Sequence, residues 1–207
     1  MSYATACAPG TPRQVEAIHS RLSELSDDGL MARIRHHDQE AFACLLARHL
    51  NPVHAYLYRL TGSRADADDL SQDTFLRVWR KAASFKPGRV KLTTWLHRVA
   101  HNLCVDDFRK RRTHAVVSLD EPPAGFEEEA VHPAIQDADC ENLELVNIAL
   151  MRLPESQRSA LVLCQIQGFS NHEGAEILGI SVSALESLLA RARRRLKNEL
   201  PEHLRNE

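Results

Sequence analysis

The sequence is poor in aromatic residues, glycine and proline, and its cysteines are unpaired in spacing; these features exclude several classes of protein. Of its 207 residues 5% are aromatic, eight are glycine and nine are proline. Alternating polar and apolar runs are almost absent, whereas long amphipathic runs have helical spacing, so an all-α fold is predicted. The five cysteines, at positions 7, 44, 104, 140 and 164, form no CxxC pair. This set predicts neither a disulfide framework nor a zinc knuckle and fits reduced thiols in a cytosol.

Long hydrophobic runs and a strong net charge are missing as well. No run approaches the roughly 18 to 20 apolar residues that span a bilayer, and the N-terminus lacks the basic, apolar and small-residue pattern of a secretory signal. A cytoplasmic protein without direct membrane insertion is therefore expected. The net charge of −2 argues against a uniformly basic protein that coats nucleic acid, so any DNA-facing charge must lie in local patches.

The stretch 65–112 changes from acidic to basic without becoming irregular. Acidic residues at its start, followed by an apolar stripe, predict a helix over 65–83 with one buried face. The acidic residues are Asp66, Asp68, Asp69 and Asp73, and the stripe consists of Leu70, Phe75, Val78, Trp79 and Ala82. A turn at 86–88 follows, after which Thr93 or Thr94 can cap a second helix that reaches Arg112. Residues 84–112 contain eight Lys or Arg against two Asp. An acidic helix suited to a protein surface thus precedes a basic helix suited to a polyanion.

These two helices carry a resemblance to a known family. The strings DADDLSQDTFLRVWRKAASF and TTWLHRVAHNLCVDDFRKRR resemble the second conserved region of bacterial sigma-70 factors, in the small extracytoplasmic-function (ECF) group. The resemblance implies that the first helix binds the clamp of RNA polymerase. The implied polymerase contacts are Asp69, Leu70, Gln72, Asp73, Leu76 and Arg80.

The resemblance further implies that the second helix and the loop before it open promoter DNA at the −10 element. A base flipped out of the stack would enter the loop at about 84–91, and nearby cations would offset the cost of unstacking, a few kcal/mol. The implied −10 contacts are Lys86, Arg89, Lys91, Arg98, Asn102, Asp106, Arg109, Lys110 and Arg112. Of these, Asn102, Asp106 and Arg109 match the family pattern N-x-x-x-D-x-x-R.

Simpler interpretations exist for the same stretch. Each charged face could be merely solvated, and Trp95 lies on the apolar stripe, which favours a core role over a wedge between bases. His97, His101 and Cys104 recur at i, i+4 and i+7, so they could share a helix face and hold a soft divalent metal. No fourth ligand is evident, and with 11 histidines in the chain coincidental spacing is the simpler account. No metal or other cofactor is expected.

Before this stretch, residues 1–26 are interpreted as an N-terminal extension. Residues 1–12 are expected to be disordered, and Val15, Ile18, Leu22 and Leu25 form a short helical stripe. Asp27 or Asp28 can cap one helix, and Asp38 can begin another. Asn51-Pro52 is expected to mark a break or a proline in a first helical turn. With the stretch described above, these helices predict a domain over 27–112.

An acidic linker is predicted over residues 113–140. No Lys or Arg occurs between Thr113 and Glu141, eight acidic residues do, and Pro122, Pro123 and Pro133 forbid a continuous helix. Solvation alone explains the acidity. The resemblance implies instead that the linker passes through the active-site and RNA-exit channel of the polymerase, where it could mimic nucleic acid.

Residues 141–207 are predicted to form a second domain built on a helix-turn-helix. In GFSNHEGAEILGISVSALESLLARARRRL, Ser170 can cap one helix, Gly179 supplies the turn and Ser181 caps the next helix. The expected wedge residues are Ala175, Ile177, Leu178, Ile180, Leu185 and Leu189. The resemblance implies −35 contacts at Ser181, Ser183, Glu186, Ser187, Arg191, Arg193 and Arg194. Glu186 and Leu188 depart from the family, in which basic residues are usual at both positions.

The sequence is therefore identified as a member of the ECF group, with two helical domains. The implied partners are core RNA polymerase, promoter DNA and an anti-sigma factor. The chain has no phosphate-cradling glycine loop and no nucleophile constellation, so it is not expected to be an enzyme or to take a small-molecule substrate. Three rivals remain: a sigma-like decoy for an anti-sigma factor, a one-component repressor that uses only the helix-turn-helix, and a metal-responsive protein.

Overall fold

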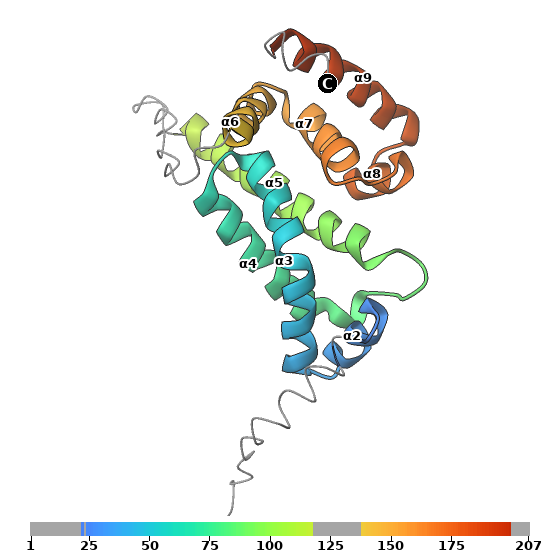
Figure 1. The fold of residues 1–207 in the computed structure, drawn as a ribbon. Coiled ribbons are helices and arrows are strands. Elements are labelled where there is room, and N and C mark those ends of the chain that lie inside the picture. The colour runs from blue at the N-terminus through green and yellow to red at the C-terminus, as the bar shows by residue number, and fades with distance from the viewer. Residues whose placement is uncertain (1–21, 23, 118–137, 200–207) are drawn as a thin grey trace, which may run out of the picture.

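The protein is entirely helical in the part that the structure describes. The computed structural model describes Leu22, residues 24–117 and residues 138–199, and no strand occurs among them. Figure 1 shows the helices, which are α2 (Asp27–Ile34), α3 (Gln39–Thr61), α4 (Arg64–Lys81), η1 (Ala82–Ser84), α5 (Leu92–Val117), α6 (Ala138–Met151), α7 (Glu155–Leu161), η2 (Val162–Ile166), α8 (Asn171–Leu178) and α9 (Val182–Glu199). The predicted all-α fold is confirmed.

The first helical unit is built around α3, which packs against α2, α4 and α5. Its apolar stripe supplies the centre of a core to which every neighbouring helix contributes. The fully buried side chains of this core include Leu30, Ile34, Leu45, Tyr56, Leu57, Leu60, Phe85 and Leu96. Burial of such side chains stabilises by roughly 1.5 to 3 kcal/mol each relative to exposure, and this burial holds the four helices together.

Side-chain caps fix where the early helices begin. The Asp38 carboxylate accepts hydrogen bonds from the backbone N–H groups of Glu40 and Ala41, both at 3.0 Å, so its predicted capping role is confirmed. The cap of α2 was expected at Asp27 or Asp28 but is Ser26, whose hydroxyl accepts from Gly29 N. Asp27 and Asp28 occupy the first turn instead, where they complement the helix dipole.

The break expected at Asn51-Pro52 does not occur. One helix of 23 residues runs through Pro52 from Gln39 to Thr61. A proline in a helix interior costs about 3 kcal/mol because a hydrogen bond is lost and the ring crowds the preceding turn. The stripe of buried side chains continues on both sides of Pro52, from Cys44 and Leu45 to Val53 and beyond. Burial of that continuous stripe offsets the local penalty, so the helix does not divide.

The connection between α4 and α5 is a short loop with an anchored start. After η1, Phe85 is buried, and its ring lies 5.5 Å from the half-buried ring of Trp95. Arg35 donates to the carbonyl groups of Ala82 and Phe85, so α2 holds the beginning of the loop. The expected caps Thr93 and Thr94 lie inside the first turn, because α5 already begins at Leu92. The half-buried Trp95 packs against the hydrophobic core, in agreement with the predicted core role.

The second helical unit ends in the predicted helix-turn-helix. Ser170 and Glu173 form a capping box at the start of α8, and Gly179 adopts the left-handed conformation (φ 66°) that the turn requires. Ser181 Oγ accepts from Ala184 N at the start of α9. Most of the predicted wedge residues are buried, but Ile180 is 36% exposed. Its position in the turn places it outside the wedge, so that expectation was wrong.

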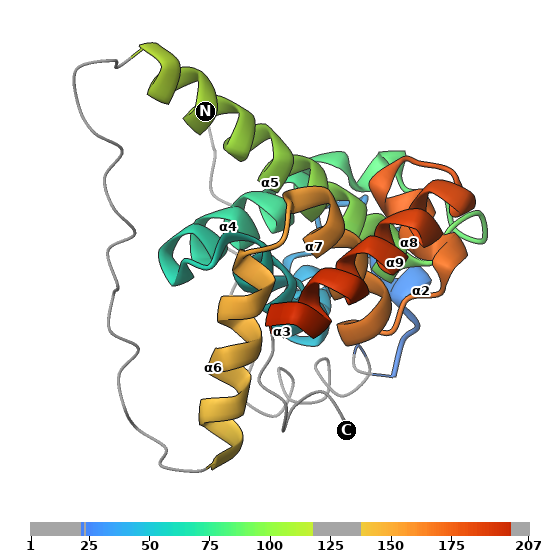
Figure 2. The ribbon, with the colours of Figure 1, turned by 90° about the horizontal axis from the view of Figure 1, so that it is seen from above.

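The two helical units contact each other. Helix α8 packs against α5, and α7 contacts α3, although these helices are far apart in the sequence (Figures 1 and 2). Helix α6 contacts α3 and α9. Close approach is evident at Gly62, where an added Cβ would lie 2.8 Å from Met151 Cε.

Some expectations fall outside the described residues. These include the disordered segment 1–12, most of the N-terminal stripe and the centre of the linker, residues 118–137. Within the described part, Leu22 is buried and its carbonyl accepts from Arg48. Helix α5 continues to Val117, and α6 begins at Ala138. The domain boundaries given above stay predictions.

Candidate polymerase and nucleic-acid interfaces

Helix α4 presents an exposed acidic face with one apolar residue in it. Asp69, Gln72, Asp73 and Arg80 are exposed, and Leu76 is 43% exposed between them. The opposite face carries Ala67, Phe75 and Val78 into the core. Leu70 was expected to contact the polymerase, but only 7% of it is exposed. Its side chain belongs to the core face of α4, and its role is corrected to packing.

The end of α5 is tied to the start of α4 by charge. Arg111 makes a bidentate pair with Asp66, at 2.6 and 2.8 Å, and its Nε lies 2.7 Å from Asp107. The hydrogen bond to Asp66 is the main reason that the pKa of Arg111 is raised. A guanidinium held in this way between two carboxylates positions the helices.

The residues expected at the −10 element are all exposed. Arg98, Asn102, Asp106 and Arg109 recur every three or four residues, so they share one face of α5. Arg109 lies 3.5 Å from Asp106 on this face. The other exposed members are Lys86, Arg89, Lys91, Lys110 and Arg112. Clustered cations around a loop and one helix face can follow a chain of phosphates.

Three residues that raised the question of a metal site face the boundary between the helical units. His97 Nδ1 lies 2.9 Å from the Thr93 carbonyl, and His101 Nδ1 lies 3.1 Å from the Tyr56 hydroxyl. Burial lowers the pKa of each histidine to about 4 and raises the pKa of Cys104 to about 12. Each histidine therefore uses one ring nitrogen within the protein. Within residues 24–117 and 138–199, no group of three or more His, Cys, Asp or Glu is arranged to hold a metal.

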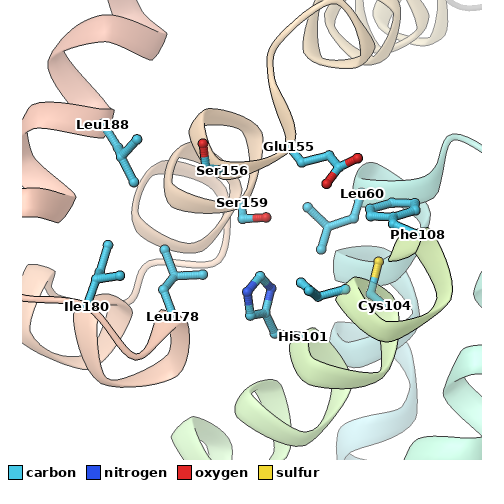
Figure 3. Close-up of a pocket in the computed structure, with 11 residues that line it drawn as sticks. Leu60, His101, Cys104, Phe108, Glu155, Ser156, Ser159, Leu178, Ile180 and Leu188 are labelled. Atoms are coloured by element: carbon cyan, nitrogen blue, oxygen red, sulfur yellow. The ribbon is translucent and has the colours of Figure 1, made fainter. Parts of the chain in front are cut away.

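A cavity of about 240 Å³ lies at this boundary. Figure 3 shows that Leu60 and α5 line one side of it, while residues of α7, α8 and α9 line the other. Most of the lining is apolar: Leu60, Cys104, Val105, Phe108, Leu178, Ile180 and Leu188. His101 and Glu155 point toward the same space (Figure 3). Sequence reasoning missed this boundary, because no local pattern marks which residues of two units will meet.

Helix α9 presents the residues expected at the −35 element. Its buried side is formed by Leu185, Leu189 and Ala192. The expected contacts are all exposed: Ser181, Ser183, Glu186, Ser187, Arg191, Arg193 and Arg194. Glu186 Oε1 lies 3.4 Å from Asn171 Nδ2 at the start of α8, a geometry in which the amide donates to the carboxylate. The neighbouring Arg193 and Arg194 make no ion pair with Glu186.

The arrangement defines a protein with one acidic surface and two separate cationic surfaces, the second on a helix-turn-helix. Family models match both parts: Sigma-70 region 2 over residues 45–114 and Sigma-70, region 4 over residues 144–196. Among the described residues, no helix has the length and apolar character needed to cross a membrane.

Named relatives agree with these matches. The chain is 38% identical over 175 residues to the ECF RNA polymerase sigma factor SigM of Mycobacterium tuberculosis, covering 84% of each chain. It is 32% identical to SigW of Bacillus subtilis, covering 81% of this chain and 93% of that protein. The chain belongs to the family of ECF RNA polymerase sigma factors, which are transcription initiation factors and not enzymes.

Solved structures give the same result. The sigma factor RpoE of Bartonella quintana, in complex with the anti-sigma factor NepR, matches with a TM-score of 0.67 and 30% identity, over 76% of this chain and 95% of that chain. CnrH in complex with the cytosolic domain of CnrY matches with a TM-score of 0.62 and 29% identity, over 83% and 95%.

Proposed function

We propose that this sigma factor uses three separate surfaces to start transcription. The exposed face of α4 binds core RNA polymerase, the loop and exposed face of α5 bind the opened −10 strand, and the start of α9 reads the −35 element. The observation that carries this assignment is the exposure of all three polar sets on helices whose opposite faces are buried. The factor acts where the polymerase acts, in the cytoplasm.

The exposed cations favour this function over the decoy and the repressor. A decoy needs only the surface that an anti-sigma factor recognises, yet cations are present on both α5 and α9. A repressor needs only α8 and α9, so the acidic face of α4 would have no function in it. Run-off transcription with core polymerase, this chain and a library of randomised promoters tests the choice. Specific transcripts support a sigma factor, and their absence despite DNA binding by α9 supports a repressor.

The polymerase contact has its own test. Substitution of Asp69→Ala together with Asp73→Ala should weaken binding to core polymerase by about tenfold, which corresponds to roughly 1.4 kcal/mol shared by two positions. Helical content should not change, because both carboxylates are exposed. The matched control is Asp28→Ala with Glu40→Ala, two exposed acidic residues on α2 and α3. Equal affinities for core polymerase in the Asp69/Asp73 variant and the wild type would refute the assignment.

An anti-sigma factor is the second proposed partner. The RpoE structure was determined with the anti-sigma factor NepR bound, and the CnrH structure with the cytosolic domain of CnrY bound. A bound protein partner in both relatives supports a similar partner for this chain. The chain purified from cells that produce it naturally should carry a second polypeptide. Run-off transcription should be blocked while that polypeptide is bound and should recover after its removal. Full activity of the complex as isolated would contradict inhibition.

A further inference from the structure

The cavity between α5 and the helices α7 to α9 has room for a small molecule. Its volume is about 240 Å³. A void larger than a water molecule is uncommon in a packed protein interior, and the side chains around it lose contacts that a bound molecule would restore. An apolar cavity of about 150 Å³ holds benzene, so this cavity suits a molecule of about 10 non-hydrogen atoms.

The walls of the cavity favour an apolar occupant over water. Aliphatic side chains and the Phe108 ring form most of the lining, on the α5 side as well as on the side of α8 and α9 (Figure 3). Walls of this kind hold water poorly, because a buried water needs about two to four polar partners. An apolar molecule gains free energy when it leaves water for such walls.

His101 supplies a hydrogen-bond donor to this lining. Its Nδ1 lies 3.1 Å from the hydroxyl of Tyr56, which is fully buried. Burial raises the pKa of the Tyr56 hydroxyl well above its usual range, so the hydroxyl stays protonated and donates to Nδ1. Burial also lowers the pKa of His101 to about 4, so the ring is neutral at neutral pH. A neutral imidazole that accepts at Nδ1 carries its proton on Nε2.

The Nε2 proton of His101 is available to a ligand. Nε2 makes no hydrogen bond to another of the described residues, whereas Nδ1 is used by Tyr56. The ring points toward the cavity (Figure 3). A ligand with a hydrogen-bond acceptor can therefore satisfy a donor that the protein itself leaves without a partner.

A neutral ligand fits this site better than a charged one. Glu155 is the one carboxylate among the lining residues, and it already pairs with Arg112. An anion would meet that carboxylate, and a cation would have to displace Arg112 from it. Either ion would also lose its water shell against apolar walls.

We propose that the cavity is a binding site for a small neutral molecule that is mostly apolar and carries one hydrogen-bond acceptor, such as a ketone or ester carbonyl. The acceptor bonds His101 Nε2, and the apolar part contacts lining residues such as Val105, Phe108 and Leu188. This inference goes beyond the proposed function and is independent of it, because none of the lining residues belongs to the proposed polymerase or DNA contacts.

The test compares two molecules of similar shape as ligands of the full-length chain. Propiophenone has a benzene ring, a short chain and a carbonyl acceptor, and propylbenzene has the same ring and chain without the oxygen. Proton–nitrogen correlation NMR of the imidazole nitrogens measures binding at His101 and identifies the tautomer of its ring. The signal of the Val105 backbone amide reports binding in variants that lack His101.

The free chain should show the His101 proton on Nε2. Propiophenone should shift the His101 signals saturably, with a Kd of about 0.1 to 1 mM for a ligand of this size. Propylbenzene should bind about threefold to tenfold more weakly, because it leaves the Nε2 proton without an acceptor. His101→Phe keeps a ring and removes the donor, so it should bind the two molecules equally.

Two variants fill the cavity from opposite sides. Val105→Phe on α5 and Leu188→Phe on α9 should each weaken propiophenone binding by at least about tenfold, because the added ring takes the space of the ligand. If one of them does not fold, the other still gives the answer. Leu50→Phe is the matched control, since Leu50 is 36% exposed on α3 and does not line the cavity. It should bind propiophenone like the wild type.

Three results would overturn the inference. The first is the lack of a saturable shift at His101 up to about 5 mM propiophenone, which would mean that the cavity holds water only. The second is binding that survives both filling variants, because the ligand would then lie elsewhere. The third is equal affinity of the wild type for the two molecules, which would exclude the bond to Nε2. Run-off transcription judges the proposed function separately.

Discussion

Acidification should destabilise the protein through His97, and the size of the effect follows from its surroundings. The ring is 4% exposed between Tyr56 and Phe169, and its Nε2 has no hydrogen-bond partner among the described residues. Burial is the main cause of its low pKa, about 4, and the nearby His49 adds to it, while the bond to the Thr93 carbonyl opposes the shift. A protonated ring at this position would have to be paired or solvated.

The sign follows from proton linkage. The folded pKa is about 4 and the reference value is 6.5, so the unfolded chain binds more protons between these values. The contribution of His97 is therefore fully present above pH 6.5 and is lost as the pH falls toward 4. Between pH 7.5 and pH 5.5 this single group lowers the free energy of unfolding by about 1.3 kcal/mol. His101, whose pKa is also lowered to about 4 by burial, acts in the same direction.

Replacing His97→Phe isolates the effect. Phenylalanine keeps a ring against Tyr56 and Phe169 and removes the unpaired Nε2, so stability at pH 7.5 should be unchanged or raised by up to about 1 kcal/mol. Urea unfolding followed by tryptophan fluorescence at pH 7.5 and 5.5 measures the difference. The variant should lose about 1.3 kcal/mol less than the wild type on acidification. His172→Gln, at an exposed position on α8, should follow the wild type. A variant that keeps the full pH dependence would refute the reasoning.

Three further variants test other parts of the molecule. Arg109→Ala with Lys110→Ala should reduce open-complex formation and lower its salt dependence, because fewer counterions are released. Permanganate footprints like those of the wild type across a salt series would contradict this prediction. Glu186→Ala should flatten base preference at one −35 position by about fivefold or more, because a carboxylate can accept a hydrogen bond from cytosine N4. Selection from randomised −35 sequences measures this preference in the wild type and the variant. Identical preferences would show that Glu186 only holds Asn171. Asp38→Ala should lower the thermal midpoint by about 2 to 6 °C through loss of the cap. Because the pKa of Asp38 is lowered, mainly by the Ala41 N–H, this difference should disappear in acid, and circular dichroism at pH 7 and pH 2 provides the check.

Local rules succeeded where a helix is fixed by neighbours in the sequence. Asp38, Ser170, Gly179 and Ser181 were identified as caps and turn, and each acts so in the structure. These roles depend on backbone groups two or three residues away, which a sequence displays directly. The same rules failed at Pro52, because the penalty of a proline is local while the burial that offsets it comes from helices elsewhere.

The roles of single charged or apolar side chains were less predictable than the faces on which they lie. The acidic character of α4 is plain in the sequence, but only packing separates the buried Leu70 from the exposed Leu76 six residues later. The run of four cations at 109–112 is equally plain. Packing decides which of these cations already has an acidic partner. Arg111 pairs with Asp66, 45 residues away in the sequence, because of how α4 and α5 cross.

The sequence by itself determined the helical class, the two sigma regions and the exposed polar sets, because periodicity, caps and charge clusters are properties of neighbouring residues. The tertiary structure alone decided that His97 meets Phe169 and that Lys91 meets Glu173. Contacts between distant elements are selected by the packing of whole faces, and a face has no partner until the rest of the chain has folded against it.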